Sequence, residues 1–281
     1  MDMETKLAQS YFRGASEPPL INETIGARLA RTISLFPDRE ALVSRHQGIR
    51  WTYREYGEQI DRLAAGLLAL GIEPGERVGI WAPNCYEWCL TQFATARIGA
   101  ILVNVNPAYR VFELEYALNK SGCKAIITAV RFKSSHYVQM LQDLSPELAQ
   151  CKPGELKAEK LPVLKTVISM GEEHTAGMFN FAEVCGMGSE NHYHRLESIG
   201  EELSVHDIIN IQFTSGTTGN PKGAALTHYN ILNNANQVSR GMRFTDVDRL
   251  CIPVPMYHCF GMVLGKMACV VNGATAVFPS D

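Results

Sequence analysis

Between residues 41 and 129 the chain alternates between short apolar runs and longer amphipathic segments, and this alternation constrains the fold most. Three of the runs, RVGIWA (77–82), AILVNVN (100–106) and KAIITA (124–129), are apolar at most positions. Strands that are apolar on both faces are typical of a parallel sheet covered by helices on both sides. The sequence therefore predicts an α/β fold of stacked lobes with mixed, largely parallel sheets.

The segments between these runs predict helices with recognisable ends. Thr52 and Glu55 have the spacing of a capping box, which opens a helix that ends at Leu70, before Gly71. Two further helices are predicted over residues 86–98 and 111–120. The first helix has one apolar face, formed by Ile60, Leu63, Ala64, Leu67 and Leu68.

Proline- and glycine-containing stretches suggest how the chain divides. We expect an N-terminal extension with a first helix over residues 1–40, and a first α/β lobe over residues 41–170. Residues 171–205 are expected to form an irregular connector. Residues 206–281 would then begin a second α/β lobe, which we expect to be incomplete at its C-terminus.

Charge and cysteine usage exclude several functional classes. The net charge is −3 and the basic residues are scattered, so nucleic acid is not expected as a partner. The eight cysteines form no C-x-x-C pair, which favours a reducing compartment over a disulfide scaffold.

Lys266, Asn272 and Gly273 interrupt the longest apolar tract, so no membrane span is predicted. The N-terminus, MDMETKLAQS, has the pattern of neither a secretory signal nor a mitochondrial presequence.

The segment FTSGTTGNPKG (213–223) has the composition of a phosphate-binding loop. It follows an apolar run, DIINIQF, and precedes a second predicted strand, GAALT, so it connects strand to strand. The Walker spacing fails because Pro221 and Gly223 stand at two of its required positions. Gly216 and Gly219 can still turn backbone N–H groups towards an anion, and Lys222 adds a positive charge. From composition alone, a flexible surface turn remains the alternative.

The motif Thr-Ser-Gly-Thr-Thr-Gly-x-Pro-Lys-Gly matches the signature of the adenylate-forming superfamily without a departure. The segments VGIWAPNCYEW, ILVNVNPAYRVFELEYALNKSGCKAII and PMYHCFGMVLGKM also resemble medium-chain acyl-CoA synthetases. The likeness spans residues 11–278 and corresponds to the N-terminal half of such enzymes. It implies the large N-terminal domain of adenylate-forming enzymes as the fold, and ATP-dependent fatty acid–CoA ligation as the activity.

The resemblance also implies site residues. His258, in PMYHCFG, would lie near the substrate carboxylate as the catalytic residue, although a structural turn with a hydrogen-bonded histidine explains the same motif. Phe260, Met262, Val263 and Leu264 would line an acyl tunnel or pack the core. The β- and γ-phosphates of ATP would be held by Thr214, Ser215, Gly216, Thr217, Thr218, Gly219, Asn220, Pro221 and Lys222.

Mg²⁺ and coenzyme A are implied as cofactor and co-substrate, but this chain offers few metal ligands. No glutamate follows Glu202, and Asp246 and Asp248 are read as a solvated turn. His192 and His194 are likewise not expected to bind metal, so no metal-ligating residue is assigned. The magnesium ligands are expected to lie mostly outside this chain.

The later motifs of the superfamily are absent, so we expect a fragment that does not complete adenylation by itself. Its last strand, GATAVF, is expected to lack neighbours. Two alternatives remain open: another adenylate-forming ligase, of the aryl-CoA or luciferase-like kind, or a non-catalytic protein that acts through binding. The resemblance suggests the mitochondrial matrix, with the cytoplasm as the alternative.

Overall fold

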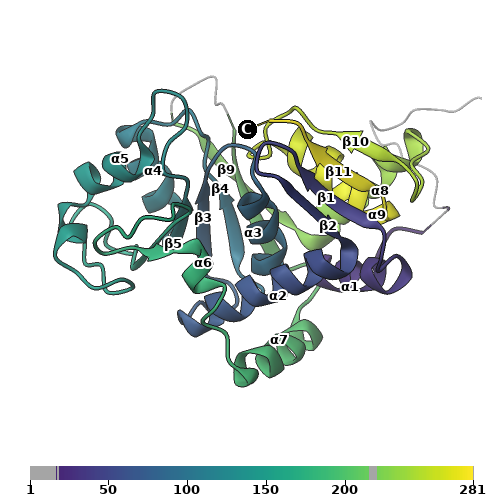
Figure 1. Cartoon of the computed structure of the whole chain (residues 1–281), viewed down its shortest axis with the longest axis horizontal. Helices are drawn as coiled ribbons and strands as arrows, with labels where there is room; N and C mark the ends of the chain where they lie inside the picture. Colours follow the sequence, from purple (N-terminus) through teal and green to yellow (C-terminus); the bar gives the residue numbers. More distant parts are fainter. Residues whose placement is uncertain (1–16, 18, 215–219, 281) are drawn as a thin grey trace, which may run out of the picture.

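The chain forms two β-sheets wrapped by helices, in a computed structural model that describes residues 17, 19–214 and 220–280 (Figure 1). The larger sheet has seven strands in the order β7-β6-β5-β3-β4-β8-β9. The smaller sheet has four strands in the order β10-β11-β1-β2. The predicted α/β class with mixed, largely parallel sheets is confirmed.

The seven-stranded sheet is parallel except at one edge, where β8 and β9 pair antiparallel. Its central strands are buried on both faces, as their continuous apolar composition predicts. The strands are β3 (Arg77–Trp81), β4 (Ile101–Asn104), β5 (Cys123–Thr128), β6 (Thr166–Ser169), β7 (Phe179–Asn180), β8 (Ile208–Thr214) and β9 (Lys222–Thr227).

The four-stranded sheet joins the two ends of the described chain. Its strands are β1 (Glu40–Ser44), β2 (Ile49–Thr52), β10 (Arg249–Cys251) and β11 (Thr275–Phe278). β11 pairs in parallel with both β10 and β1. The expectation that this last strand lacks neighbours is wrong, because a strand more than 200 residues earlier in the sequence returns to pair with it.

The helices follow their sequence signals closely. At the start of α2, the Thr52 hydroxyl accepts from Glu55 N at 3.2 Å, and Thr52 N donates to the Glu55 carboxylate at 2.8 Å. Gly71, just beyond the helix, has a φ of 74°, which glycine adopts readily. The helices are α1 (Ile25–Leu35), α2 (Tyr53–Ala69), α3 (Tyr86–Arg97), α4 (Val111–Ser121), α5 (Tyr137–Leu144), a 3₁₀ turn (Pro146–Ala149), α6 (Phe181–Val184), α7 (Glu190–Glu202), α8 (His228–Gly241), a π-helix (Phe260–Met267) and α9 (Ala268–Asn272).

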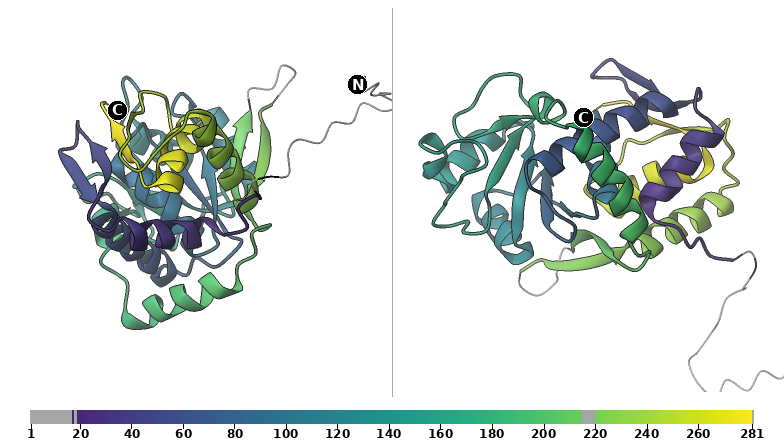
Figure 2. Two further views of the ribbon diagram at one scale, coloured as in Figure 1. Left: turned by 90° about the vertical axis from the view of Figure 1, so that its right-hand side faces the viewer. Right: turned by 90° about the horizontal axis from the view of Figure 1, so that it is seen from below.

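Two features bear on the predicted division of the chain. Residues 171–205 were expected to be irregular, but α7 lies within them and forms the outermost layer against α2 (Figure 2). Leu196 and Ile199 are its buried residues, and two apolar positions are a weak periodic signal. Each sheet also takes strands from both predicted lobes.

Helix α3 lies in the middle of the molecule and is buried on all sides, from Glu87 to Ala96. Trp88 and Phe93 contribute the largest side chains of this helix to the core, and both are fully buried. A helix surrounded by protein needs no polar face. Among the described residues, no helix is long and apolar enough to cross a membrane.

Candidate functional site

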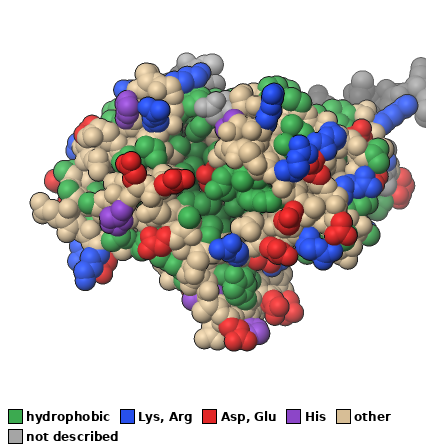
Figure 3. Space-filling view, in the orientation of Figure 1, with side chains coloured by type: hydrophobic (Ala, Val, Ile, Leu, Met, Phe, Trp, Pro, Cys, Tyr) green, Lys and Arg blue, Asp and Glu red, His purple; other side chains and the backbone are tan. Residues whose placement is uncertain are grey.

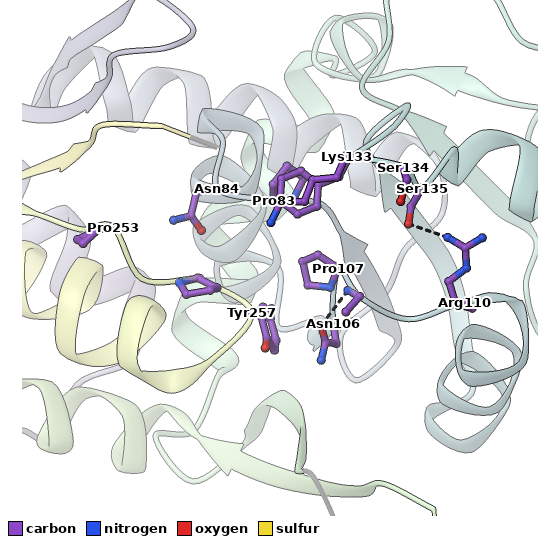
Figure 4. A pocket seen from close by; sticks show the side chains of 13 residues that line it. Pro83, Asn84, Asn106, Pro107, Arg110, Lys133, Ser134, Ser135, Pro253 and Tyr257 are labelled. Atoms are coloured by element: carbon purple, nitrogen blue, oxygen red, sulfur yellow. Dashed lines mark hydrogen bonds between the residues drawn. The ribbon is translucent and has the colours of Figure 1, made fainter.

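A pocket of about 580 Å³ opens at the carboxyl edge of the parallel strands, where β3, β4 and β5 end (Figure 4). The segment that precedes the π-helix forms its opposite wall. Such an edge is where ligands bind in open α/β sheets. The lining residues are Pro83, Asn84, Asn106, Pro107, Ala108, Arg110, Phe132, Lys133, Ser134, Ser135, Pro253, Pro255 and Tyr257.

Two cations, Arg110 and Lys133, stand on one side of this pocket. Arg110 Nη1 donates to Ser135 Oγ at 2.9 Å. Phe132 and Ser135 exchange two backbone hydrogen bonds of 2.9 Å, which close a tight turn. Lys133 lies in that turn with a φ of 52°, an uncommon conformation for a residue with a side chain. The turn therefore holds a positive charge at the rim.

Asn84 fixes the opposite wall of the pocket, and the sequence reasoning did not single it out. Its Nδ2 donates to Val254 O at 2.9 Å, and its Oδ1 accepts from Met256 N at 2.8 Å. The side chain is 6% exposed. It thus joins the loop after β3 to the segment that carries His258. Its position directly after a strand and a proline was the available signal.

His258 is exposed and follows Tyr257, which lines the pocket. Its Nδ1 accepts a hydrogen bond from Phe260 N at 3.1 Å. Nδ1 therefore carries a lone pair, and in the neutral ring the proton resides on Nε2. This tautomer offers a hydrogen-bond donor to an acceptor outside the protein.

The central residues of the predicted phosphate loop, Ser215, Gly216, Thr217, Thr218 and Gly219, lie outside the described residues. Its two ends are adjacent, because Thr214 and Lys222 are directly paired across β8 and β9. The prediction that the loop connects strand to strand is thus confirmed. Asn220 is exposed, and Pro221 O accepts from the Tyr116 hydroxyl at 3.2 Å. The loop leaves β8 at the same edge of the sheet as the pocket, because β8 is parallel to β4.

Several side-chain amides lie deeper, beneath the π-helix. Asn104 Nδ2 donates to Tyr257 O at 3.2 Å and to Met262 Sδ at 3.4 Å. Gln212 accepts from Cys259 Sγ at 2.8 Å. Gln92 and Asn210 line a small cavity of about 10 Å³. Within residues 17, 19–214 and 220–280, both amide atoms of Gln92 and Asn210 Oδ1 have no hydrogen-bond partner. A buried unpaired polar atom costs about 1–3 kcal/mol.

Lys266, which the sequence showed only as a break in an apolar tract, is buried in the π-helix. Its Nζ donates to Cys89 O at 2.6 Å and lies 4.7 Å from the centroid of the Phe93 ring. Burial lowers the pKa of this ammonium group to about 8, against the opposing influence of Cys89. The amine thus holds α3 to the π-helix.

Asp246, Asp248 and His192, to which the sequence analysis assigned no metal, have other partners in the structure. Asp246 forms an ion pair with Arg39 at 2.7 Å, and Asp248 accepts from Thr245 N at 2.6 Å. Ser189 N donates to His192 Nδ1 at 3.0 Å, which caps α7. In the described part of the chain, no three His, Cys, Asp or Glu side chains cluster as a metal site. These residues do not fit a bound Mg²⁺. All eight cysteines are free thiols.

A hydrophobic band crosses the middle of the face shown in Figure 3, between the halves that contain the two sheets.

The chain is 46% identical over 276 residues to a zebrafish (Danio rerio) protein named "Medium-chain acyl-CoA ligase ACSF2, mitochondrial". It is 44% identical to the human (Homo sapiens) protein of the same name. The alignments cover 98% and 96% of this chain but 45% of each relative, so the chain spans less than half of their length. The expected resemblance to medium-chain acyl-CoA synthetases, including acyl-CoA synthetase family member 2, is confirmed.

The fold also matches a solved structure, that of a long-chain-fatty-acid-CoA ligase from Archaeoglobus fulgidus, with a TM-score of 0.74 and 24% identity. The match covers 97% of this chain and 50% of that one, and it shows a shared fold. A family model described as AMP-binding enzyme matches residues 29–281. This chain therefore belongs to the AMP-binding enzyme family.

Proposed function

We propose that this chain carries the substrate-activating part of an ATP-dependent acyl-CoA ligase for medium-chain fatty acids. In the first step a carboxylate oxygen attacks the α-phosphorus of ATP, and the bond to the bridging oxygen breaks as pyrophosphate leaves. In the second step the thiol of coenzyme A attacks the acyl carbon, loses its proton, and AMP leaves with the carboxylate oxygen. The observation that carries the proposal is the identity of 44–46% to medium-chain acyl-CoA ligases over nearly the whole chain.

The phosphate loop is assigned to the β- and γ-phosphates of ATP. Its ends, Thr214 and Lys222, are paired across β8 and β9, so both ends of the loop lie at the carboxyl edge of the parallel strands. A lysine about 4 Å from a phosphate charge contributes roughly 4 kcal/mol at an effective dielectric near 20, before desolvation. One lysine does not neutralise a triphosphate, so backbone N–H groups and hydroxyls of the loop must share the charge.

His258 is assigned to the carboxylate of the acid. With its proton on Nε2, the ring can donate a hydrogen bond to a carboxylate oxygen and orient it for attack. Asn84 and Asn104 act as positioning residues, because they hold the backbone of residues 254–257 through three hydrogen bonds. The acyl chain would follow the π-helix into the interior, where Met262 and Val263 are buried.

Arg110 and Lys133 are assigned to a phosphate-bearing substrate in the open pocket. ATP and coenzyme A both carry phosphates, and steady-state kinetics of rim variants would tell them apart. ATP-dependent ligation also calls for Mg²⁺ to offset phosphate charge. We place its protein ligands in the part of the relatives' length that this chain does not span. The relatives are named mitochondrial, and we propose the same location, in the matrix, for this protein.

Acyl-CoA formation by the full-length protein that contains this chain tests the proposal. Saturated acids of increasing length and benzoate would be supplied with ATP and coenzyme A, and acyl-CoA would be quantified by mass spectrometry. The proposal predicts a maximum at medium chain length. Preferred turnover of benzoate would point to an aryl-CoA ligase, and failure with every acid would favour a binding function.

A further inference from the structure

Gln212 is a buried amide that the proposed function does not use, although it contacts the segment that carries His258. It lies on β8, two residues before the end of that strand. Its partner in the sheet is Asn104, the last residue of β4. The two residues are 6% and 1% exposed, and both side chains reach the segment that precedes the π-helix.

The contacts of these two amides bracket His258. Asn104 Nδ2 donates to Tyr257 O at 3.2 Å, and Gln212 Oε1 accepts from Cys259 Sγ at 2.8 Å. The residues directly before and after the histidine are thus each tied to one of two paired strand positions. The histidine therefore cannot shift along the sheet without breaking one of these contacts.

Met262 completes this arrangement from the side of the π-helix. Met262 N donates to His258 O at 3.1 Å, so the carbonyl of the histidine is held as well. The Met262 sulfur lies 3.4 Å from Asn104 Nδ2 and 3.7 Å from Gln212 Nε2. Met262 is fully buried, and its close packing against both amides limits the rotamers open to them.

Gln212 also lies close to the phosphate loop along the chain. Thr214, two residues further on, ends β8 and is paired with Lys222 at the start of β9. The strand is paired with β4 on one side and β9 on the other at Gln212 itself. One short, doubly paired stretch of strand therefore carries both the start of the loop and the contact to Cys259.

We propose, on the basis of the acyl-CoA ligase function proposed above, that Gln212 is a positioning residue that holds His258 in register with the phosphate loop. It acts through Cys259, because its side chain is buried beneath the histidine segment. The groups to be aligned are the carboxylate assigned to His258 and the ATP phosphates assigned to the loop. A misplacement of about 1 Å between such groups can cost about 100-fold in rate. Loss of the contact should therefore slow the reaction of bound substrates more than it weakens their binding.

The test measures kcat and KM with octanoate, ATP and coenzyme A, in the full-length protein that contains this chain. Gln212→Leu removes the acceptor at nearly constant size. We expect kcat to fall about tenfold while KM for ATP changes less than about twofold. Gln92→Leu is the matched control and should keep the wild-type kcat. It makes the same substitution at a glutamine that is 4% exposed and has no hydrogen bond to a described residue.

The outcomes separate this inference from the proposed function. If the wild type is active and Gln212→Leu keeps its kcat, the positioning role is wrong and the ligase function stands. If the wild type forms no acyl-CoA with any acid, the proposed function itself fails.

The partner residue provides a test that does not depend on the folding of Gln212→Leu. Cys259→Ser keeps a donor for Gln212 and should retain most of the activity, whereas Cys259→Ala removes the donor and should lower kcat about tenfold. Equal kcat values for these two variants would overturn the inference.

A double substitution then shows whether Gln212 acts on the histidine. With His258→Ala already present, Gln212→Leu should lower kcat no further, because the residue that it positions is gone. A further loss of about tenfold in that background would show that Gln212 acts on another group, and would contradict the assignment.

Discussion

Asn84 lies just before helix α3 and Gln92 lies in its middle, and their side-chain amides differ in whether they have hydrogen-bond partners. Asn84 has both amide atoms satisfied by the backbone of residues 254 and 256, and it shapes the rim pocket. Gln92 has neither amide atom satisfied by a described residue, and it lines the small cavity beneath the π-helix. A satisfied buried amide stabilises a backbone, whereas an unsatisfied one costs stability and can be recovered by a ligand. The two amides should therefore respond differently when their polar atoms are removed.

Lys222→Ala should give the largest effect, because it removes the cation assigned to the phosphates at the rim. We expect the rate of adenylation that depends on the fatty acid to fall about 100-fold or more. This is the scale of the effect when one charge-stabilising group is lost. Initial rates of pyrophosphate release by the full-length protein would measure it. Lys157→Ala, at an exposed position in the same chain, is the control. Equal rates for the two variants would remove the phosphate assignment from Lys222.

Low pH should lower the free energy of unfolding through His228, which is buried in the interior. Burial lowers the pKa of His228 to about 4, with an opposing contribution from Asp207, and its Nδ1 accepts from Ile25 N at 3.1 Å. The folded form therefore resists protonation that the unfolded chain undergoes near pH 6.5. The contribution of His228 to the free energy of unfolding is fully present above pH 6.5. As the pH falls to about 4, this contribution is lost, by on the order of 3 kcal/mol.

Urea unfolding between pH 7.5 and 4 would show this loss. His228→Gln should flatten the acid limb, because it removes the titrating group. His194→Gln, with a side chain 69% exposed, should not alter it. An unchanged acid limb in His228→Gln would show that another group controls the loss.

Asn84→Ala should disturb the wall of the open pocket and leave the small cavity lined by Gln92 unchanged. It leaves Val254 O and Met256 N without their present partner, so we expect a loss of about 2 kcal/mol in the free energy of unfolding. The segment carrying His258 should also become less ordered, which would lower kcat more than it raises KM. Chemical denaturation and steady-state kinetics would be compared. A fully stable, fully active Asn84→Ala would show that the bridge is dispensable.

Gln92→Leu should have the opposite effect on stability. It removes two buried polar atoms without described partners and replaces them with apolar surface of similar size, so stability should stay the same or rise by about 1 kcal/mol. The same denaturation experiment, run beside Asn84→Ala, measures the contrast. A loss as large as that of Asn84→Ala would mean that Gln92 has a strong partner in the folded protein.

Lys133→Ala should have the smallest effect. The side chain is exposed at the rim, where a single charge pair contributes about 0.2–1 kcal/mol, so KM for one phosphate-bearing substrate should rise up to about fivefold. Separate titrations of ATP and coenzyme A would identify that substrate. Lys157→Ala again serves as the control, and an unchanged KM for both substrates would remove Lys133 from the pocket's function.

Signals between residues close in the sequence predicted most helices and strands. Pairing between segments far apart in the sequence could not be predicted in this way. Thr52 and Glu55 placed a helix start correctly, because a capping box depends on residues three apart. The neighbours of β11 were missed, because its pairing with β1 joins segments more than 200 residues apart. Helix α7 was missed because two buried apolar residues give a weak period.

The candidate site shows the same limit. The signature motif at residues 214–223 predicted a phosphate loop, and the family resemblance through PMYHCFG implied a role for His258. Asn84, Gln92 and Asn210 were not found, because a single amide in an apolar segment does not reveal what it contacts. Their roles follow from hydrogen bonds, or from missing ones, between elements far apart in the chain.

Carboxylate-dependent exchange of labelled pyrophosphate into ATP tests the central claim most directly, because it isolates the adenylation step from coenzyme A. The full-length protein that contains this chain would be incubated with octanoate, with benzoate, or with no acid. The account predicts exchange that requires an acid and is abolished by Lys222→Ala. Exchange that is absent with every acid, or that proceeds equally without one, would contradict it.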